Sequence, residues 1–387
     1  MSEDKYDAIV IGLGSMGSAT CWRMAQRGAR VLGIDRFEPP HRRGSHGGDS
    51  RIVRQAYFEH PDYVPLLQKA YRGWDELADV SGYTLFERTG LLYFGPAEHL
   101  LIAGTLESSR RYSVPVEKVS ASDYPLFQVP RDYSCLMERD AGFVRPDLAI
   151  ESMLHAARAN GAELKTNEKV IAWNQSNGGM KVVTENGNYR ARTLVIVSGA
   201  WGGQLIPQLN RHLTVTQQAL VWVKPKNERD VALGVLPCWT LADEKYPGIF
   251  YGFPSLPTRR GGSGRGFKLA HHAAGLPVED LDGEDPAVHE AVLDSIRDIL
   301  DRYFPGRFES ELRMESCRYT NSPDGDFMVD YLEPFSRDVI YALGFSGHGF
   351  KFAPAIGDVL ARTALEGKRD SAVEFLSSKR LDLGEIA

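Results

Sequence analysis

The sequence predicts an α/β (α+β) fold that is divided into two domains. Three observations support this prediction. The chain has 387 residues, which is more than one typical hydrophobic core accommodates. Residues 7–35 show a strand, a glycine turn, a helix and a second strand, which is the order of a parallel βαβ unit. Segments of this kind return around residues 146–205 and near the C-terminus, with strand-rich stretches between them.

The composition argues against several other classes of protein. The formal net charge is −6, so the chain lacks the basic surplus that nucleic-acid binding usually needs. No apolar run is long enough to cross a bilayer, and the first residues, MSEDKYD, are acidic and do not resemble a signal peptide. We therefore expect neither nucleic acid nor a membrane as partner, and a cytoplasmic location. No metal is expected either, because the cysteines are too scattered for a zinc site or a disulfide framework: Cys21, Cys135, Cys238 and Cys317.

Each element of the N-terminal unit has a characteristic sequence. Residues 7–12, DAIVIG, form a short apolar run that suits a strand buried on both faces. Residues 15–27 have a helical composition, and Gly28 follows them as a helix C-cap would. Residues 29–35, ARVLGID, predict the second strand, which should lie parallel to the first.

The turn between the first strand and the helix carries the pattern G-x-G-x-x-G at Gly12, Gly14 and Gly17. Its position after a strand and before a helix, with Asp35 about 20 residues further on, is the context of a Rossmann dinucleotide-binding site. The three glycines permit a tight turn, a close approach of the backbone to the pyrophosphate, and close helix packing. Asp35 is expected to accept hydrogen bonds from the ribose hydroxyls and to repel a 2′-phosphate, which disfavours NADP. The motif alone does not distinguish FAD from NAD.

The middle of the chain contains further helices and strands. Apolar residues at helical spacing predict helices over residues 61–80, 148–160 and 286–303. Alternating or apolar runs predict strands at 168–173, 180–185, 191–199, 213–223 and 248–253, the last two in a separate sheet. Residues 83–94 alternate and are interrupted by Gly90, which predicts a hairpin. The glycine-rich segment 259–266 is expected to be a loop.

The C-terminal part of the chain has the order strand, turn and helix. Residues 338–343 predict the strand, 344–349 the glycine turn, and 353–365 the helix. The chain is therefore expected to leave the dinucleotide-binding domain and to return to it. We predict a discontinuous cofactor domain, residues 1–80, 146–215 and 320–387, and a substrate domain, residues 81–145 and 216–319.

Several later motifs narrow the class of protein. They are SHGGDSRIVR at 45–54, IFYGFP at 249–254, Lys268-x-x-x-His272, SCRYTNSPDGDFMVD at 316–330 and GFSGHGFKF at 344–352. Together with the N-terminal unit, and in this order over nearly the whole chain, they resemble the monomeric sarcosine oxidase and N-methyltryptophan oxidase family of FAD-dependent amine oxidases. The resemblance implies a Rossmann-type FAD domain of the glutathione-reductase-like class, a mixed-sheet substrate domain, dioxygen as electron acceptor, and a monomer.

The resemblance also implies where the cofactor is bound. Cys317, in C-x-Y-T-N-x-P-D, stands at the position of a thioether to the flavin, so covalent FAD is expected. One departure from the family is visible: Gly47 follows His46, where the family usually has two adjacent histidines, so one flavin-side histidine is lost. The remaining positions expected to bind the cofactor are Gly12, Gly14, Ser15, Met16, Gly17, Asp35, Arg36, Ser45, Ser50, Arg51, Val170, Ser198, Gly199, Gly347, His348, Gly349, Phe350 and Lys351.

A substrate site beside the flavin is implied by the same resemblance. Arg54 and Lys351 match the pair that binds the substrate carboxylate, Arg54 in a bidentate way and Lys351 as a point charge. Tyr251 and His272 match pocket residues, and His272 is expected to hydrogen-bond the amine or to tune its protonation. Lys268 matches a lysine that activates oxygen. The expected catalytic set is Lys268, His272, Arg51 and Tyr251, with apolar walls at Phe58 and Tyr319.

The turn from Gly347 to Lys351 opens the last predicted helix. Free N–H groups and a cation at that end would stabilise the negative charge of a reduced flavin. The preferred hypothesis is therefore an oxidase that transfers hydride from a secondary amine, such as sarcosine or another N-methyl amino acid, to FAD. Electrons then pass to O₂, which gives H₂O₂ and, after hydrolysis of the imine, formaldehyde.

Other functions stay open. A cyclic imino acid, such as pipecolate or proline, or a fructosyl amino acid would suit the same scaffold. An NAD-dependent dehydrogenase would share the glycine motif but leaves C-x-Y-T-N-x-P-D and G-H-G-F-K unexplained. A non-catalytic flavin-binding subunit would not need the cations Arg54 and Lys351.

Overall fold

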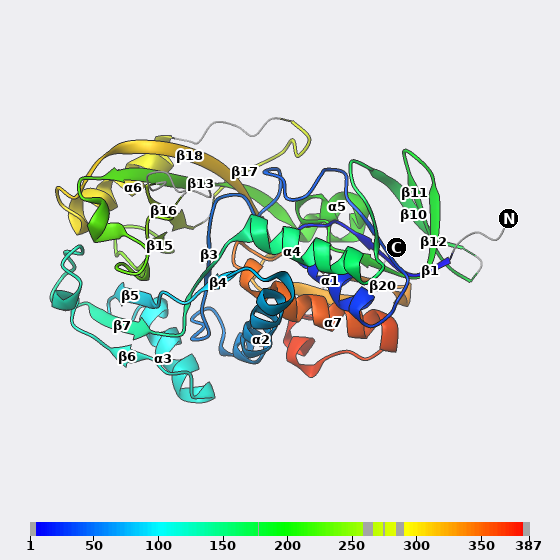
Figure 1. Ribbon diagram of the computed structural model, residues 1–387, viewed down its shortest axis with the longest axis horizontal. Coiled ribbons are helices and arrows are strands. Elements are labelled where there is room, and N and C mark those ends of the chain that lie inside the picture. The colour runs from blue at the N-terminus through cyan, green and yellow to red at the C-terminus, as the bar shows by residue number, and fades with distance from the viewer. Residues whose placement is uncertain (1–4, 177, 258–265, 274, 284–289, 382–387) are drawn as a thin grey trace.

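The computed structural model describes residues 5–176, 178–257, 266–273, 275–283 and 290–381. Its two large sheets lie side by side along the long axis of the molecule (Figure 1). One sheet contains the N-terminal strands, and the other is built from the middle of the chain. The α/β fold class predicted from the sequence is confirmed.

The first sheet has eight strands and includes the N-terminal βαβ unit. Its main path, in spatial order, is β10 (Val170–Ser176), β11 (Gly179–Thr184), β12 (Asn188–Ile196), β1 (Lys5–Ile11), β2 (Val31–Ile34) and β9 (Glu163–Lys165). Two further strands, β20 (Ser336–Leu343) and β19 (Met328–Leu332), continue from β12. β1 runs parallel to β2, as predicted, and it is also parallel to β12. Ala8, Ile9 and Val10 of β1 are fully buried, which confirms a strand covered on both faces.

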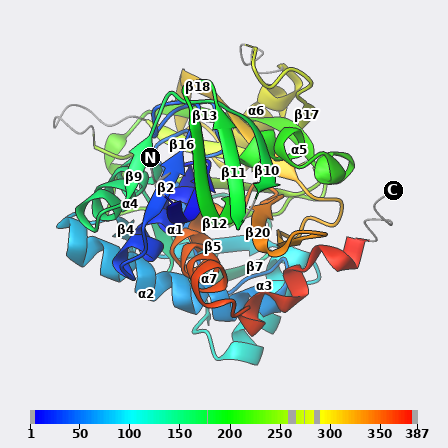
Figure 2. The ribbon, with the colours of Figure 1, turned by 90° about the vertical axis from the view of Figure 1, so that its right-hand side faces the viewer.

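Helices form a core with this sheet. They are α1 (Ser15–Gln26), α4 (Pro146–Ala159) and α7 (Ala353–Glu366), and α2 (Val64–Ser81) packs on α4 and α7. Figure 2 shows α2 and α7 together below the strands β10, β11 and β12. Helix α1 packs against both α4 and α7, and the apolar residues of all four helices belong to one hydrophobic cluster. This packing fixes the start of α1 relative to the end of β1.

The second sheet has nine strands and is mixed, as predicted. Its main path is β17 (Leu276–Pro277), β13 (Thr214–Pro225), β16 (Phe267–His272), β15 (Ile249–Phe253), β14 (Cys238–Leu241), β5 (Leu91–Gly95), β7 (Ser134–Glu138) and β6 (Glu117–Lys118). β14 is parallel to β5, whereas the other pairs are antiparallel. β18 (Phe308–Asn321) lies along β13 and places Cys317 opposite Gln218. Two helices, α3 (Leu100–Tyr112) and α6 (Glu290–Tyr303), contact β5 and β16.

The hairpin predicted over residues 83–94 is wrong. β4 (Phe86–Glu87) pairs with β8 (Gly142–Val144), which also pairs with β3 (Arg51–Val53) in a small third sheet. β5 pairs instead with β7 and β14. Between them, Gly90 adopts a φ of +78° and donates its amide to the carbonyl of Ala141, so the chain passes from one sheet to another. Alternation indicates a strand, but tertiary packing selects its partner.

Most other predicted elements occur with slightly different ends. The helix expected over 61–80 begins with a 3₁₀ turn, Pro61–Tyr63, before α2. The loop expected over 259–266 falls almost wholly outside the described residues, as does the start of the helix expected over 286–303. The two-domain boundaries stay a prediction, and β13 and β18 run across two of them, at 215/216 and 319/320.

Candidate active site

The glycine turn lies between the end of β1 and the start of α1. Gly14 is the N-cap of α1, and the first turn of this helix contains no acidic side chain. Its positive dipole end is therefore available to an anion. A Cβ atom on Gly17 would lie 1.7 Å from the carbonyl oxygen of Gly12, so only glycine allows the helix and the turn to pack this closely.

A large cavity opens at this turn, and we call it the nucleotide cavity. Its empty volume is about 1260 Å³, including space that is open to solvent. Many residues predicted to bind the cofactor line it: Gly12, Gly14, Ser15, Met16, Asp35, Arg36, Ser45, Arg51, Val170, Ser198, Gly199, Gly347, Gly349 and Phe350.

Unpaired polar atoms in the nucleotide cavity test whether it fits FAD. The side-chain oxygens of Ser198 and Thr320 and the Nδ1 atom of His41 are buried, without a hydrogen-bond partner among the described residues. All three residues line the nucleotide cavity. Buried polar groups are normally paired, so these atoms are suited to a polar ligand. The hydroxyl, phosphate and ring groups of FAD meet this need, and the residues present therefore fit the cofactor.

Asp35 lines the nucleotide cavity and also supports the glycine turn. Its Oδ2 accepts a hydrogen bond from the amide of Leu13 at 2.7 Å, and its Oδ1 accepts one from Phe37 at 2.9 Å. Burial raises the pKa of Asp35, while these amide donors oppose the shift. A carboxylate has further lone pairs, so the geometry is compatible with a ribose contact, which stays a prediction.

A second cavity, with an empty volume of about 520 Å³, adjoins the nucleotide cavity. Its lining contains Arg51, Ile52, Arg54, Glu59, Thr240, Ile249, Tyr251, His272, Tyr319, Gly347, His348, Phe350 and Lys351. Arg51, Gly347 and Phe350 line both cavities, so the two meet at these residues. Gly347 has a φ of +78°, and a Cβ there would lie 2.2 Å from the Tyr319 ring. Glycine therefore keeps this junction open.

Arg51 holds the loop at the junction of the two cavities. Its guanidinium donates to the carbonyls of Ser45 at 3.1 Å, Ser50 at 2.9 Å, and Gly47. It also lies 3.3 Å from the sulfur of Cys317. Cys317 is buried and lines neither cavity, yet it touches a residue that lines both. The guanidinium of Arg51 thus connects the sulfur of Cys317 to the loop at the junction of the two cavities.

Lys268 lies next to this loop in an apolar setting. Its Nζ donates to the carbonyl of Ser50 at 2.9 Å and to its hydroxyl at 3.2 Å. The Phe253 and Trp222 ring centroids lie 4.6 and 5.4 Å from the ammonium. Burial lowers the pKa of Lys268 well below its usual range, and the charge of Arg51 adds to this effect. Lys268 and Ser50 line neither cavity.

Arg54 forms part of the wall of the second cavity and is paired inside it. Its Nη2 atom contacts both carboxylate oxygens of Glu59, at 2.7 and 2.6 Å, and its Nη1 donates to the Ala56 carbonyl at 3.1 Å. The rings of Tyr57 and Phe58 each lie 4.2 Å from the guanidinium carbon. Burial alone would raise the pKa of Glu59, but Arg54 and other nearby cations lower it to about 2.

Lys351 lies on the same side of the second cavity as Arg54. Its Nζ donates to the carbonyl of His348 at 2.8 Å and lies 5.1 Å from the Tyr57 ring centroid. Arg54 contacts this same ring, so the two cations predicted as a pair are held beside one aromatic side chain. Burial lowers the pKa of Lys351 to about 7, and Arg54 adds to this shift, whereas Glu59 opposes it.

A histidine and two tyrosines line another part of the second cavity. The Nδ1 atom of His272 lies 3.2 Å from the hydroxyl of Tyr319, which in turn neighbours Tyr251. His272 ends β16, and Tyr251 lies on the adjacent strand β15. Burial lowers the pKa of His272 to about 4, so its imidazole is neutral near pH 7.

The loop that departs from the family pattern is compact. His46 lines the nucleotide cavity, and its Nε2 atom accepts a hydrogen bond from the amide of His41 at 3.2 Å. Burial lowers the pKa of His46 to about 3. A Cβ on Gly47 would have its nearest neighbour, the Ser316 carbonyl, at 3.9 Å, so a side chain has room to start there.

The structure brings most of the predicted site residues to the two cavities. Five of them line neither cavity: Gly17, Ser50, Phe58, Lys268 and Cys317. Sequence reasoning missed Glu59, Thr240, His41, Trp201 and Thr320 as lining residues. Glu59 belongs to no motif. The only indication in the sequence is that its carboxylate follows shortly after Arg54 in the chain.

A family model for FAD dependent oxidoreductases matches residues 7–363 of the chain. The chain therefore belongs to this family and is an FAD-dependent amine oxidoreductase. It is 35% identical to monomeric sarcosine oxidase from Streptomyces avermitilis, over 97% of this chain and 98% of that protein. It is 34% identical to N-methyl-L-tryptophan oxidase from Yersinia pestis, over 92% of this chain and 94% of that protein.

A solved structure shows the same fold. L-proline dehydrogenase from P. horikoshii superposes with a TM-score of 0.81 at 21% identity, and the match covers 100% of both chains. Family membership assigns FAD as the cofactor and so answers the question that the glycine motif left open between FAD and NAD. In the part of the chain that the structure describes, no helix is long and apolar enough to cross a membrane.

Proposed function

We propose that this protein is an oxidase of N-methyl amino acids, with sarcosine as the simplest substrate. One observation carries the proposal: a cavity that fits FAD meets a second cavity whose wall holds the buried cations Arg54 and Lys351. The curated relatives, named sarcosine oxidase and N-methyl-L-tryptophan oxidase, support it. When bound, FAD would supply the two-electron acceptor, with O₂ as the final oxidant and H₂O₂ as the product.

The carboxylate of the substrate is proposed to bind Arg54 and Lys351. Both side chains are almost fully buried, so an anion between them is shielded from water and strongly attracted. Glu59 already holds the guanidinium of Arg54. A substrate carboxylate therefore replaces or shares this contact, and Glu59 sets the affinity by competing for the same donors.

The amine of the substrate is proposed to lie near His272. Only a neutral amine gives up hydride readily, and a neutral imidazole can accept a hydrogen bond from the N–H of the substrate. The low pKa of His272, about 4, keeps its ring in this neutral form at physiological pH. Tyr319 contacts Nδ1 at 3.2 Å and fixes the orientation of the ring, while Tyr251 closes the same wall.

Two residues next to the loop of Arg51 are proposed to act on the flavin side. In its protonated form, Lys268 would supply the positive charge that favours electron transfer to O₂. Cys317 would hold FAD through a thioether, since its sulfur lies beside Arg51, at the junction of the cavities. A monomeric state and a cytoplasmic location stay predictions.

Peroxide release from the purified, FAD-loaded protein tests the proposed activity. We expect H₂O₂ with sarcosine or with an N-methyl amino acid of larger side chain, and formaldehyde in equal amount. Faster turnover of pipecolate or proline, or of a fructosyl amino acid, would assign one of the alternative substrates on the same scaffold. Bound FAD without peroxide from any of these amines would favour a non-catalytic flavin-binding subunit.

The pH dependence of carboxylate binding tests the role of Lys351. Acetate serves as a non-oxidisable ligand that stays ionised above pH 6, and the pKa values of His272 and His348, about 4 and 3, lie below this range. With a pKa near 7, Lys351 is charged below pH 7 and neutral above it. The inhibition constant of acetate should therefore be constant at low pH and rise by up to about tenfold per pH unit above pH 7.

The variant Lys351→Met is the control for this experiment. It should bind acetate weakly at every pH, with a flat profile between pH 6 and 9. An identical profile in the wild type and in this variant would show that another group causes the dependence.

A further inference from the structure

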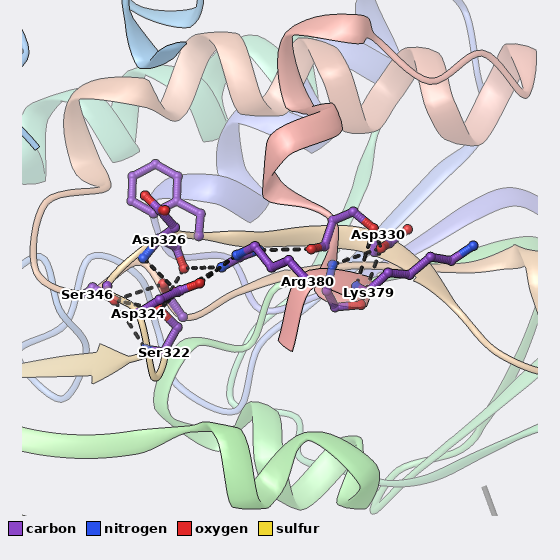
Figure 3. Close-up of polar contacts among 12 residues, drawn as sticks. Ser322, Asp324, Asp326, Asp330, Ser346, Lys379 and Arg380 are labelled. Atoms are coloured by element: carbon purple, nitrogen blue, oxygen red, sulfur yellow. Dashed lines mark hydrogen bonds and ion pairs between the residues drawn. The ribbon is translucent and has the colours of Figure 1, made fainter. Parts of the chain in front are cut away.

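The C-terminal segment is attached to the first sheet beside the candidate active site. Asp330 on β19 accepts hydrogen bonds from the hydroxyl of Ser377 at 2.5 Å and from the amide of Ser378 at 2.9 Å. These contacts fix the start of a short 3₁₀ turn, Ser378–Leu381, which carries Arg380. Figure 3 shows Arg380 extending from this turn towards Asp324 and Asp326.

Arg380 closes the turn that joins β18 to β19. Its Nε and Nη2 atoms bind the two carboxylate oxygens of Asp324 at 2.7 and 3.0 Å, and Nη2 also donates to the carbonyl of Asp326 at 2.9 Å. Within the turn, the Ser322 hydroxyl donates to the same carbonyl at 2.6 Å (Figure 3). A bidentate arginine on one side and a serine on the other therefore fix the backbone of this turn.

The same turn holds the imidazole of His348. The carbonyl of Gly325 lies 3.0 Å from Nε2 of His348, and the hydroxyl of Tyr57 lies 2.5 Å from Nδ1. A carbonyl can only accept, so Nε2 carries the hydrogen of the neutral ring and Nδ1 accepts from Tyr57. Burial lowers the pKa of His348 to about 3, which keeps the ring neutral. The turn thus selects one tautomer.

His348 connects the turn to the two cations of the second cavity. Its carbonyl accepts from Lys351, and its partner Tyr57 provides the ring beside which Arg54 and Lys351 lie. We propose that Arg380 is a positioning residue, which fixes the tautomer and orientation of His348 and, through Tyr57, the spacing of the cation pair. The substrate part of this proposal rests on the proposed function, whereas the tautomer part does not.

Nitrogen NMR of the holoenzyme, labelled with ¹⁵N at histidine, tests the tautomer. At about pH 7 the wild type should show one set of signals of the Nε2–H form that disappears in His348→Gln. In Arg380→Gln these signals should move towards a mixture of both tautomers. Unchanged His348 signals in Arg380→Gln would overturn the proposal.

Lys379→Gln is the matched control, since it removes one positive charge from the same turn. Figure 3 shows the Lys379 side chain extending away from the contact between Arg380 and Asp324. It should leave the histidine spectrum as in the wild type. A change of equal size in Lys379→Gln would show that net charge, and not the bidentate contact, is responsible, which also overturns the proposal.

Steady-state kinetics give a second, independent readout. In Arg380→Gln the KM for an N-methyl amino acid should rise roughly 3- to 10-fold, while kcat changes less than about twofold. This range is typical of residues that act on a site through intermediate contacts. Arg380→Lys should return the KM only part of the way to the wild-type value. Lysine keeps the positive charge but lacks the two N–H groups that bind both carboxylate oxygens of Asp324. A parallel fall of kcat and rise of KM, with a lower midpoint of thermal unfolding and unchanged His348 signals, would reduce Arg380 to a structural role. If even the wild type oxidises no amine, the proposed function fails, and the NMR spectra still decide the positioning role.

Discussion

Arg54→Gln is expected to lower kcat/KM for an N-methyl amino acid by about 10²- to 10³-fold, the range for removing one partner of a buried ion pair. The side chain of Arg54 is 4% exposed, and its guanidinium lies beside the rings of Tyr57 and Phe58. The loss should appear mainly in KM, because the carboxylate is bound in both the ground and the transition state. Initial rates of peroxide release over a wide substrate range measure it.

Two controls separate binding from folding in this experiment. Arg54→Gln leaves the partly buried carboxylate of Glu59 without its arginine partner, so the double variant with Glu59→Gln removes that charge and should recover thermal stability but not affinity. An N-methyl amine without a carboxylate should be oxidised equally slowly by the wild type and by Arg54→Gln. A similar loss with this amine would place the defect in the flavin environment and contradict the proposed carboxylate contact.

Cys317→Ser is expected to abolish covalent attachment of FAD completely. When the wild type is precipitated with acid, the flavin should stay in the pellet, whereas in the variant it should appear in the supernatant. The mass of the intact denatured chain should differ by one flavin between the two proteins. The physical reason is that serine keeps the shape of the side chain but lacks the polarisable thiolate needed as nucleophile.

Cys135→Ser provides the matched control for the linkage, because Cys135 is likewise buried in a strand of the nine-stranded sheet. It should retain flavin in the pellet. Flavin that remains attached to Cys317→Ser would mean that another residue forms the bond, and flavin in the supernatant of the wild type would show a non-covalent enzyme.

The fold was predictable where local pattern and tertiary contacts agree. The run from residue 7 to Asp35 predicted a strand, a helix and a parallel strand, and all three occur, because the apolar residues of β1 have no alternative to burial on both faces. The prediction over residues 83–94 failed for the opposite reason. Its strands are short, and Gly90 sends the chain into another sheet, which no local pattern encodes.

The candidate site was predictable as a set of residue types but not as a set of contacts. The motifs around Arg54 and Lys351 predicted two cations for one carboxylate, and both residues line one cavity. Only the packing shows that Glu59 forms an ion pair with Arg54. Only the packing shows that burial brings the pKa of Lys351 to about 7. Ion pairing and desolvation depend on distances in space, and the separation of residues along the chain does not give these distances.

By itself, the sequence determined the class of this protein, through the later motifs together with the N-terminal unit. The glycine turn, with Asp35 behind it, predicts a dinucleotide, since backbone N–H groups and a helix end form that site almost without side chains. Only the tertiary structure decided how the C-terminal Arg380 reaches the turn beside His348, and that the two cavities meet at Arg51, Gly347 and Phe350. Such contacts join segments far apart in the chain, and their geometry is set when the sheets pack, not by the local preference of any residue.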